Sequence, residues 1–284
     1  MKHHTTLVHV ALLALVATLW GCSHAPPVVE APPTTAEPTT TRVVSYNIRH
    51  GRGMDNRVDL ARTADVLRRL SPDVVGLQEV DHVVGRSGSV DQAGSLAAML
   101  SRPGEQWHAA FGAFMPLQGG RYGMGILSRF PIERSWSIPL PDGNEPRIAL
   151  AARVRPPKGE PFTIVNVHFD WVDDDRFRFA QASALAAVLR GLDTPFVLLG
   201  DFNDQPGSRT LDLFHALADE APKAGPDGTP AQGRDRLTFS SAEPTIEIDF
   251  IFLGPKGAWP RATSRVEEEP MASDHRPVVA GVKR

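Results

Sequence analysis

Short apolar runs rich in β-branched residues alternate along most of the chain with segments of helical spacing. The short runs predict strands over residues 42–48, 73–80, 125–128, 147–154, 163–169, 196–199, 246–253 and 277–282. Apolar side chains recurring every three to four positions predict helices over residues 60–70, 92–100 and 177–192. This alternation is typical of an α/β domain. The Gly/Pro-rich stretch 223–236 is predicted to be a surface loop.

The chain begins with an apolar leader. The stretch Leu7–Trp20 is short for a membrane span, so residues 1–21 are predicted to be a signal peptide. Cys22, the single cysteine of the chain, follows directly, and residues 19–22 (LWGC) resemble the lipobox of bacterial lipoproteins. We therefore expect lipidation at Cys22 and anchoring in the bacterial cell envelope; a plain secretory signal is the alternative. Ser23 is not the aspartate that commonly retains lipoproteins at the inner membrane, which favours the outer membrane, facing the periplasm.

Residues 22–41 are rich in proline and threonine and are predicted to be a tether, followed by one catalytic domain over residues 42–284. This domain contains no cysteine and therefore no disulfide. The formal net charge of the whole chain is -3. A protein that binds nucleic acid without sequence preference needs many Lys and Arg contacts to phosphate, so bulk DNA or RNA is not the favoured substrate.

Polar residues follow four of the predicted buried strands, at Asn47, Glu79, His168 and Asp201. Each has an ordinary alternative, because polar residues and glycine are frequent where a strand turns. Glu79 is a candidate ligand for a divalent cation, which prefers oxygen ligands. Asp201 is a candidate base for deprotonating water, and a cationic histidine beside a carboxylate could contact a phosphoryl oxygen.

The chain resembles the endonuclease/exonuclease/phosphatase superfamily, which includes deoxyribonuclease I, neutral sphingomyelinases and inositol polyphosphate 5-phosphatases. The resemblance rests on motifs in family order: SYNI (45–48), LQEV (77–80), YGMGILS (122–128), NVH (166–168), GDFN (200–203), IDF (248–250) and SDHRP (273–277). It implies a four-layered α/β/β/α sandwich of two mixed β-sheets with the active site along one sheet edge. It also implies Mg²⁺ or Mn²⁺ as cofactor, held by Asn47, Glu79 and Asp274.

The same resemblance assigns roles to other residues. Asp201 would orient the attacking water, Asn203 would stabilise the phosphoryl oxygens, and Asp249 would pair with His275 at the phosphate. His168 corresponds to a histidine of deoxyribonuclease I and the sphingomyelinases. Four further positions are weaker candidates for contact with substrate: Tyr122, Arg147, Arg86 and Arg178.

Three residues also have structural alternatives. Arg86 could lie in a solvated turn before the next helix. Arg178 could lie on an exposed helix face. Trp171 is expected in the core, with a platform for substrate as the second interpretation.

The opening SYNIRHG, the RSG segment at 86–88 and the DQ pair at 91–92 are similar to bacterial relatives of the C-terminal domain of calcofluor white hypersensitive protein, which acts in lipid remodelling. The expected function is metal-dependent hydrolysis of a phosphodiester, in a lipid or a small molecule, by in-line attack of water on phosphorus. A secreted nuclease and a non-catalytic surface binding protein are the alternatives. No protein partner is predicted.

Overall fold

The computed structural model describes residue 1 and residues 40–284 of the chain. The predicted signal peptide, the lipidation site Cys22 and nearly all of the predicted tether lie outside the described residues. Among the described residues, no helix is long and apolar enough to cross a bilayer.

The domain is built on two mixed β-sheets of six strands each. The first sheet has the strand order β11 (Arg261–Val266), β12 (Val278–Lys283), β1 (Thr41–Asn47), β2 (Val74–His82), β4 (Gly120–Ser128) and β3 (His108–Leu117). The second sheet has the order β5 (Ile132–Pro139), β6 (Ile148–Val154), β7 (Phe162–His168), β8 (Phe196–Asp201), β10 (Asp249–Gly254) and β9 (Asp219–Glu220).

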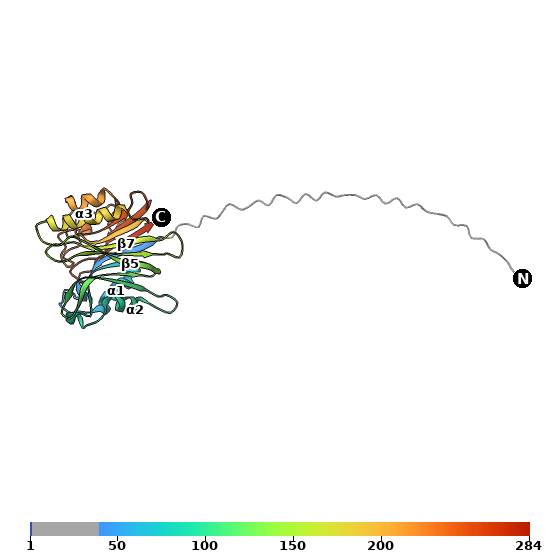
Figure 1. The fold of residues 1–284 in the computed structure, drawn as a ribbon, viewed down its shortest axis with the longest axis horizontal. Helices are drawn as coiled ribbons and strands as arrows, with labels where there is room; N and C mark the ends of the chain where they lie inside the picture. Colours follow the sequence, from blue (N-terminus) through green and yellow to red (C-terminus); the bar gives the residue numbers. More distant parts are fainter. Residues whose placement is uncertain (2–39) are drawn as a thin grey trace. The chain divides into compact units, whose positions relative to one another are not determined.

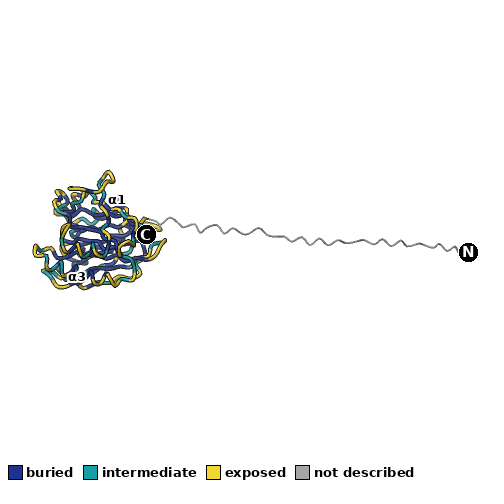
Figure 2. The backbone as a smooth tube through the Cα atoms, turned by 90° about the horizontal axis from the view of Figure 1, so that it is seen from above, coloured by how far each residue is buried: buried dark blue, intermediate teal, exposed yellow. Residues whose placement is uncertain are grey.

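Helices cover the outer face of each sheet (Figure 1). Helices α1 (Leu60–Leu70) and α2 (Gln92–Leu100) pack on the first sheet, and α3 (Arg176–Arg190) and α4 (Arg209–His215) pack on the second. One buried apolar cluster lies between the sheets and one lies between each sheet and its helices. Figure 2 shows the buried backbone running through the interior of these layers. The predicted four-layered α/β/β/α sandwich is confirmed.

Each sheet contains one β-α-β unit. Strands β1 and β2 are parallel, with Val43 opposite Val74, and α1 connects them. Strands β7 and β8 are parallel, with Ile164 opposite Val197, and α3 connects them. Every other strand pair is antiparallel. The last residues of β1 and β8, Asn47 and Asp201, lie within hydrogen-bonding distance of each other, so the two units meet at one edge of the sandwich.

Side-chain caps explain where the helices of the first layer begin. The carboxylate of Asp59 accepts a hydrogen bond from the backbone N–H of Arg62 at 3.1 Å, and that of Asp91 accepts one from Gly94 at the same distance. Such N-caps satisfy backbone donors that the first helical turn leaves unpaired. The predicted bounds 60–70 and 92–100 are confirmed.

Some elements were not predicted. Strands β3, β5, β9 and β11 and the short helix α4 were missed, and the strand predicted from residue 246 begins at Asp249. Most residues of β5 are intermediate or exposed, and it carries Glu133 and Arg134, so it lacks the continuous apolar run of a buried strand. The loop predicted over 223–236 is largely irregular and exposed, except that Lys223 is buried against Glu247 at 2.6 Å.

Candidate active site

The register of three neighbouring strands assembles the first half of the site. In the second sheet, the last residue of β7, His168, is opposite the last residue of β8, Asp201. Asp201 is in turn opposite Asp249, the first residue of β10, because β10 runs antiparallel to β8. Paired residues on adjacent strands point to the same face of a sheet, so the three side chains share one surface. All three are at most 5% exposed.

Asn47 joins this surface to the first sheet. Its amide Nδ2 lies 3.2 Å from Oδ2 of Asp201 and 3.2 Å from Oε1 of Glu79. The amide oxygen accepts a hydrogen bond from the backbone N–H of Arg49 at 3.1 Å, which fixes the side-chain amide with its nitrogen toward the two carboxylates. Asn47 therefore lies between the carboxylates of Glu79 and Asp201 and donates to both.

Glu79 reaches the site through a β-bulge. The sequence places Glu79 at the end of a strand, but β2 continues to His82, and its register against β4 shifts between Leu77 and Val80. Glu79 itself has a φ of 57°, in the left-handed region. The amide of Asn166, in the opposite sheet, donates to the carbonyls of Leu77 at 2.8 Å and Gly125 at 2.9 Å. Because these contacts satisfy buried carbonyls beside the bulge, Asn166 supports the backbone that presents Glu79.

The carboxylate of Asp249 accepts a hydrogen bond from the ring of His275, with 3.0 Å between Oδ2 and Nδ1. Burial alone would lower the pKa of His275, but Asp249 and Asp201 outweigh this effect and raise that pKa to about 10. The other ring nitrogen, Nε2, lies 3.6 Å from Oδ2 of Asp201. His275 is therefore an imidazolium at neutral pH, with one N–H directed at the site.

The pKa values of Asp201 and His168 are both shifted from the ordinary values of these side chains. Burial raises the pKa of Asp201 to about 7, and the charge of Asp249 adds to this rise while His275 opposes it. Nε2 of His168 lies 3.5 Å from Oδ2 of Asp201. Burial, with Arg147 and His275 nearby, lowers the pKa of His168 well below its ordinary value. One carboxylate thus lies between a charged and a neutral imidazole.

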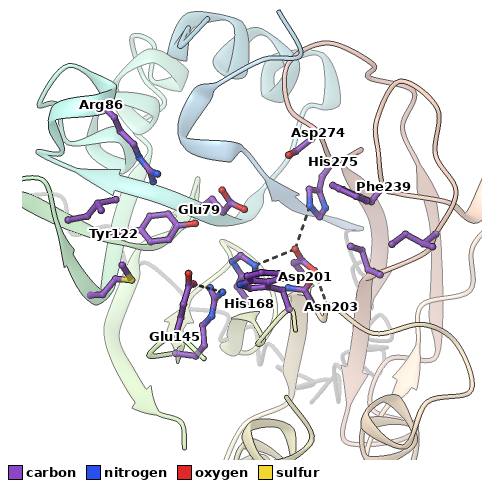
Figure 3. Close-up of a pocket in the computed structure, with 16 residues that line it drawn as sticks. Glu79, Arg86, Tyr122, Glu145, His168, Asp201, Asn203, Phe239, Asp274 and His275 are labelled. Carbon is purple, nitrogen blue, oxygen red and sulfur yellow. Dashed lines mark hydrogen bonds and ion pairs between the residues drawn. The ribbon is translucent and has the colours of Figure 1, made fainter. Parts of the chain in front are cut away.

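These groups open into a cavity of about 610 Å³ (Figure 3). The cavity is lined by charged, aromatic and aliphatic side chains: Glu79, Arg86, Met115, Leu117, Tyr122, Glu145, Arg147, His168, Trp171, Asp201, Asn203, Phe239, Ile246, Ile248, Asp274 and His275. Most of the site residues predicted from the sequence are therefore brought together here. Asn47 and Asp249 lie directly behind the lining residues.

Arg147 lines this cavity and carries unpaired hydrogen-bond donors. Its side chain is 2% exposed and forms an ion pair with Glu145 at 2.9 Å. Its Nε and Nη1 atoms are buried and have no hydrogen-bond partner within the described residues. Burial and the charge of Glu79 raise the pKa of Tyr122 far above its usual range, so that its phenol remains a donor. Both residues are suited to bind an anionic oxygen.

Arg86 lies in a short, largely exposed turn, η2 (Gly85–Ser87), and also lines the cavity. Its guanidinium makes two hydrogen bonds of 2.9 Å to the buried carboxylate of Asp81 and lies over the ring of Tyr122, 4.9 Å from its centre. Its side chain is 29% exposed, so part of the guanidinium faces the cavity. Arg86 was predicted from the sequence, whereas its partner Asp81 was not.

Two predicted side chains occupy less direct positions. Arg178 does not line the cavity: it is buried, lies 3.1 Å from Asp204 and contacts the carbonyl of Val172. This arrangement favours a structural role over contact with substrate. Asn203 does line the cavity, but its Nδ2 donates to the carbonyl of Phe169 at 3.0 Å and its backbone N–H donates to Asp201 at 3.0 Å.

Trp171 is not a core residue. It is 58% exposed and lines the cavity, so the interpretation as core packing is wrong and the platform interpretation fits its position. Several other lining residues were not identified from the sequence: Met115, Leu117, Glu145, Phe239, Ile246 and Ile248. Five of them lie in segments without a family motif, and Ile248 begins the IDF motif but was not singled out. Their place at the cavity becomes recognisable only when β3 and the loops come together at the sheet edge.

The donor set fits a divalent cation. Carboxylates of Glu79 and Asp274 face the cavity together, and no Lys, Arg or His side chain of the described residues forms an ion pair with Glu79. Asp274 lies 3.2 Å from Arg49. Asp201, Asp249 and His275 also have ligand atoms within 4.8 Å of one another, but the hydrogen bond between Asp249 and His275 already occupies two of these groups. Hard oxygen donors at Glu79 and Asp274 therefore fit Mg²⁺ or Mn²⁺ better than the buried trio does.

Comparison with known proteins agrees with this geometry. The model of the endonuclease/exonuclease/phosphatase family matches residues 44–275. The chain belongs to this family. Its members are usually hydrolases of phosphate esters and typically use divalent metal ions. The uncharacterized protein YbhP of Escherichia coli K12 is 29% identical over 256 residues, which cover 85% of this chain and 95% of YbhP.

Solved structures of the family share the fold. The catalytic domain of human Nocturnin with bound sulfate is 20% identical, with a TM-score of 0.63, over 86% of this chain and 94% of Nocturnin. A mannosyl-6-phosphatase from Bacteroides thetaiotaomicron is 21% identical, with a TM-score of 0.61, over 86% of this chain and 100% of its own. At these identities the likeness establishes the architecture and not the substrate.

Proposed function

We propose that this protein hydrolyses phosphodiesters by metal-assisted attack of water on phosphorus. The proposal rests on one observation: three side-chain nitrogen atoms surround Oδ2 of Asp201. The Nδ2 atom of Asn47 lies 3.2 Å from it, Nε2 of His168 lies 3.5 Å away and Nε2 of His275 lies 3.6 Å away. A carboxylate held by polar groups at the floor of a cavity is suited to orient and deprotonate water.

Asp201 supports this role through its pKa. A base works best when its pKa is close to the working pH, and burial raises the pKa of Asp201 to about 7. Asp201 can therefore accept the proton of the attacking water and release it again near neutral pH. The backbone N–H of Asn203 donates to its second oxygen, Oδ1, at 3.0 Å and holds the carboxylate in one orientation.

His275 would stabilise the phosphoryl group. The hydrogen bond to Asp249 keeps Nδ1 protonated, and the Nε2–H, which lies 3.6 Å from Oδ2 of Asp201, would donate to a phosphoryl oxygen as negative charge develops. His168 would act as a neutral imidazole, because its pKa is lowered, and would donate a hydrogen bond to a leaving or non-bridging oxygen. Arg147 would bind a further oxygen through its unpaired Nε and Nη1 atoms.

Glu79 and Asp274 would hold a divalent cation, with Asn47 positioning Glu79. When bound, a Mg²⁺ or Mn²⁺ ion supplies Lewis-acid polarisation of the phosphoryl oxygens. The family's typical use of divalent metals supports this assignment. Anchoring of the enzyme in the cell envelope through Cys22 is part of the proposal and rests on the sequence.

An activity panel separates the proposed function from its alternatives. The purified protein, with Mg²⁺ or Mn²⁺, would be assayed against bis-p-nitrophenyl phosphate, single- and double-stranded DNA, and RNA. We expect hydrolysis of the small diester with little cleavage of the polymers. Preferred cleavage of DNA or RNA would make the protein a secreted nuclease, and binding without turnover of any substrate would make it a binding protein.

A further inference from the structure

The two ends of the cavity differ in chemistry. One end, here the charged wall, carries Arg86, Glu145, Arg147 and Trp171, with the β3 side chains Met115 and Leu117 next to Tyr122 on the same side. The other end, the apolar wall, carries Phe239, Ile246 and Ile248. Figure 3 shows Arg86 and Glu145 on one side of His168, Asp201 and His275, and Phe239 on the opposite side. A phosphoryl group at the reactive residues would therefore direct its two ester substituents toward unlike surroundings.

The charged wall is suited to a hydroxylated group. Glu145 is an acceptor and Arg147 a donor, and the pair is fixed by its ion pair of 2.9 Å. An alcohol can donate to such a carboxylate and accept from such a guanidinium at the same time. Trp171, 58% exposed, adds a flat apolar surface on which the C–H face of a polyol can pack.

A buried carboxylate holds the charged wall together. Asp170 is fully buried and accepts a hydrogen bond of 2.6 Å from the backbone N–H of Asn144. It accepts a weaker one of 3.4 Å from the N–H of Glu145, and it directly precedes Trp171 in the chain. Asp170 thus connects the segment that carries Glu145 to the segment that carries Trp171. These hydrogen bonds fix the two segments of the charged wall relative to each other.

The apolar wall contains no charged side chain. The ring of Phe239 packs against that of His275, with 4.9 Å between the ring centres. Ile246 lies beside Phe239, whose backbone N–H donates to the carbonyl of Ile246 at 3.1 Å. Ile248 is 6% exposed and Ile246 is only partly buried, so these side chains form a surface that water alone would cover poorly.

We infer that the substrate is an unsymmetrical phosphodiester, with a hydroxyl-bearing substituent against the charged wall and an apolar substituent against the apolar wall. This inference rests on the proposed function and narrows its substrate class. A polynucleotide carries a sugar on both sides of each phosphate and would leave the apolar wall without a matching group. An ester with two alkyl chains would bury one of them against Glu145 and Arg147.

Three synthetic diesters test the inference: hexyl glyceryl phosphate, dihexyl phosphate and diglyceryl phosphate. Hydrolysis by the metal-loaded full-length protein would be followed by ³¹P NMR, below the concentrations at which the esters aggregate. We expect kcat/KM for the mixed ester to exceed that of each symmetrical ester by about tenfold or more, the factor that roughly 1.4 kcal/mol of matched contacts would give. Equal values for the mixed ester and either symmetrical ester would overturn the inference.

Variants connect this preference to the two walls. Lengthening the alkyl chain of the glyceryl ester from methyl to hexyl should raise kcat/KM by roughly twofold per methylene, about half the effect of full burial. Ile246→Asn should flatten this series, and Glu145→Gln should reduce the gain from replacing a propyl by a glyceryl group. Met99→Asn, at an exposed position on α2 away from the cavity, is the matched control. A chain-length series that Ile246→Asn leaves unchanged would contradict the assignment of the apolar wall.

Hydrolysis of bis-p-nitrophenyl phosphate separates two kinds of failure. If this activated diester is cleaved but the mixed ester has no advantage, the inference fails and the proposed function stands. If no diester is cleaved under any metal condition, the proposed function itself fails.

Discussion

Oδ2 of Asp249 lies 3.0 Å from Nδ1 of His275, and both side chains are buried. This contact keeps a positive charge on a histidine that burial alone would neutralise. Asp249→Asn should therefore lower kcat by about 10²- to 10⁴-fold, the usual contribution of a positioned acid or base group, while the free energy of unfolding changes little by comparison. Steady-state kinetics and urea denaturation would measure the two effects. Glu243→Gln, at an exposed position, is the control; a loss of activity matched by loss of folded protein would assign Asp249 to structure.

His50 should make the stability of the protein depend on pH. Burial, together with the nearby Arg86, lowers the pKa of His50 from 6.5 to about 4. Between these pH values the unfolded chain binds more protons at this residue than the folded chain does. The contribution of His50 to stability is therefore fully present above about pH 6.5 and is lost as the pH falls toward 4.

The substitution His50→Asn isolates this effect. Asparagine tolerates the left-handed conformation that His50 adopts, with a φ of 45°, and it does not titrate. Urea midpoints at pH 7 and pH 4.5 should differ less for the variant than for the wild type. Identical pH dependence in the two proteins would show that His50 is not a source of acid sensitivity.

Asp170 should position the charged wall. Asp170→Ala would leave the N–H groups of Asn144 and Val172 without their acceptor and should cost about 2–4 kcal/mol of unfolding free energy. Because the segment with Glu145 would loosen, KM for a glyceryl diester should rise more than kcat falls. Asp142→Ala, in the same segment but exposed, is the control. Unchanged stability, or equal effects from both substitutions, would argue against this role.

The lipid anchor is tested at Cys22, the only thiol of the chain. Cys22→Ser should abolish incorporation of radiolabelled palmitate in the bacterial host and release the protein from the membrane fraction. Palmitate labelling that persists in this variant would disprove lipidation at Cys22.

The sequence predicts best what depends on local patterns. The caps at Asp59 and Asp91 and the apolar faces behind them define α1 and α2 to the residue. The polar ends of β1, β7 and β8 were visible because each follows a continuous apolar run. Strands such as β5, which are half exposed, carry no such run and were missed.

Features that depend on contact between distant segments could not be predicted. The bulge that turns Glu79 into the site is stabilised by Asn166 from the other sheet, 87 positions away in the chain. The pairing of Asp170 with Asn144 and the contact of Phe239 with His275 likewise follow from how the loops close over the sheet edge. The sequence therefore identified most of the polar residues that meet at the cavity, whereas Glu145, Phe239 and Ile246 required the structure.

The central claim is that Asp201 and a divalent cation together drive hydrolysis of a phosphodiester. It is tested most directly by the rate of p-nitrophenolate release from bis-p-nitrophenyl phosphate after treatment of the full-length protein with EDTA and return of Mg²⁺ or Mn²⁺. The wild type should be inactive in EDTA and recover with the metal, and Asp201→Asn should remain about 10²- to 10⁴-fold slower under the same conditions. Undiminished turnover in excess EDTA, or wild-type rates for Asp201→Asn, would contradict the account.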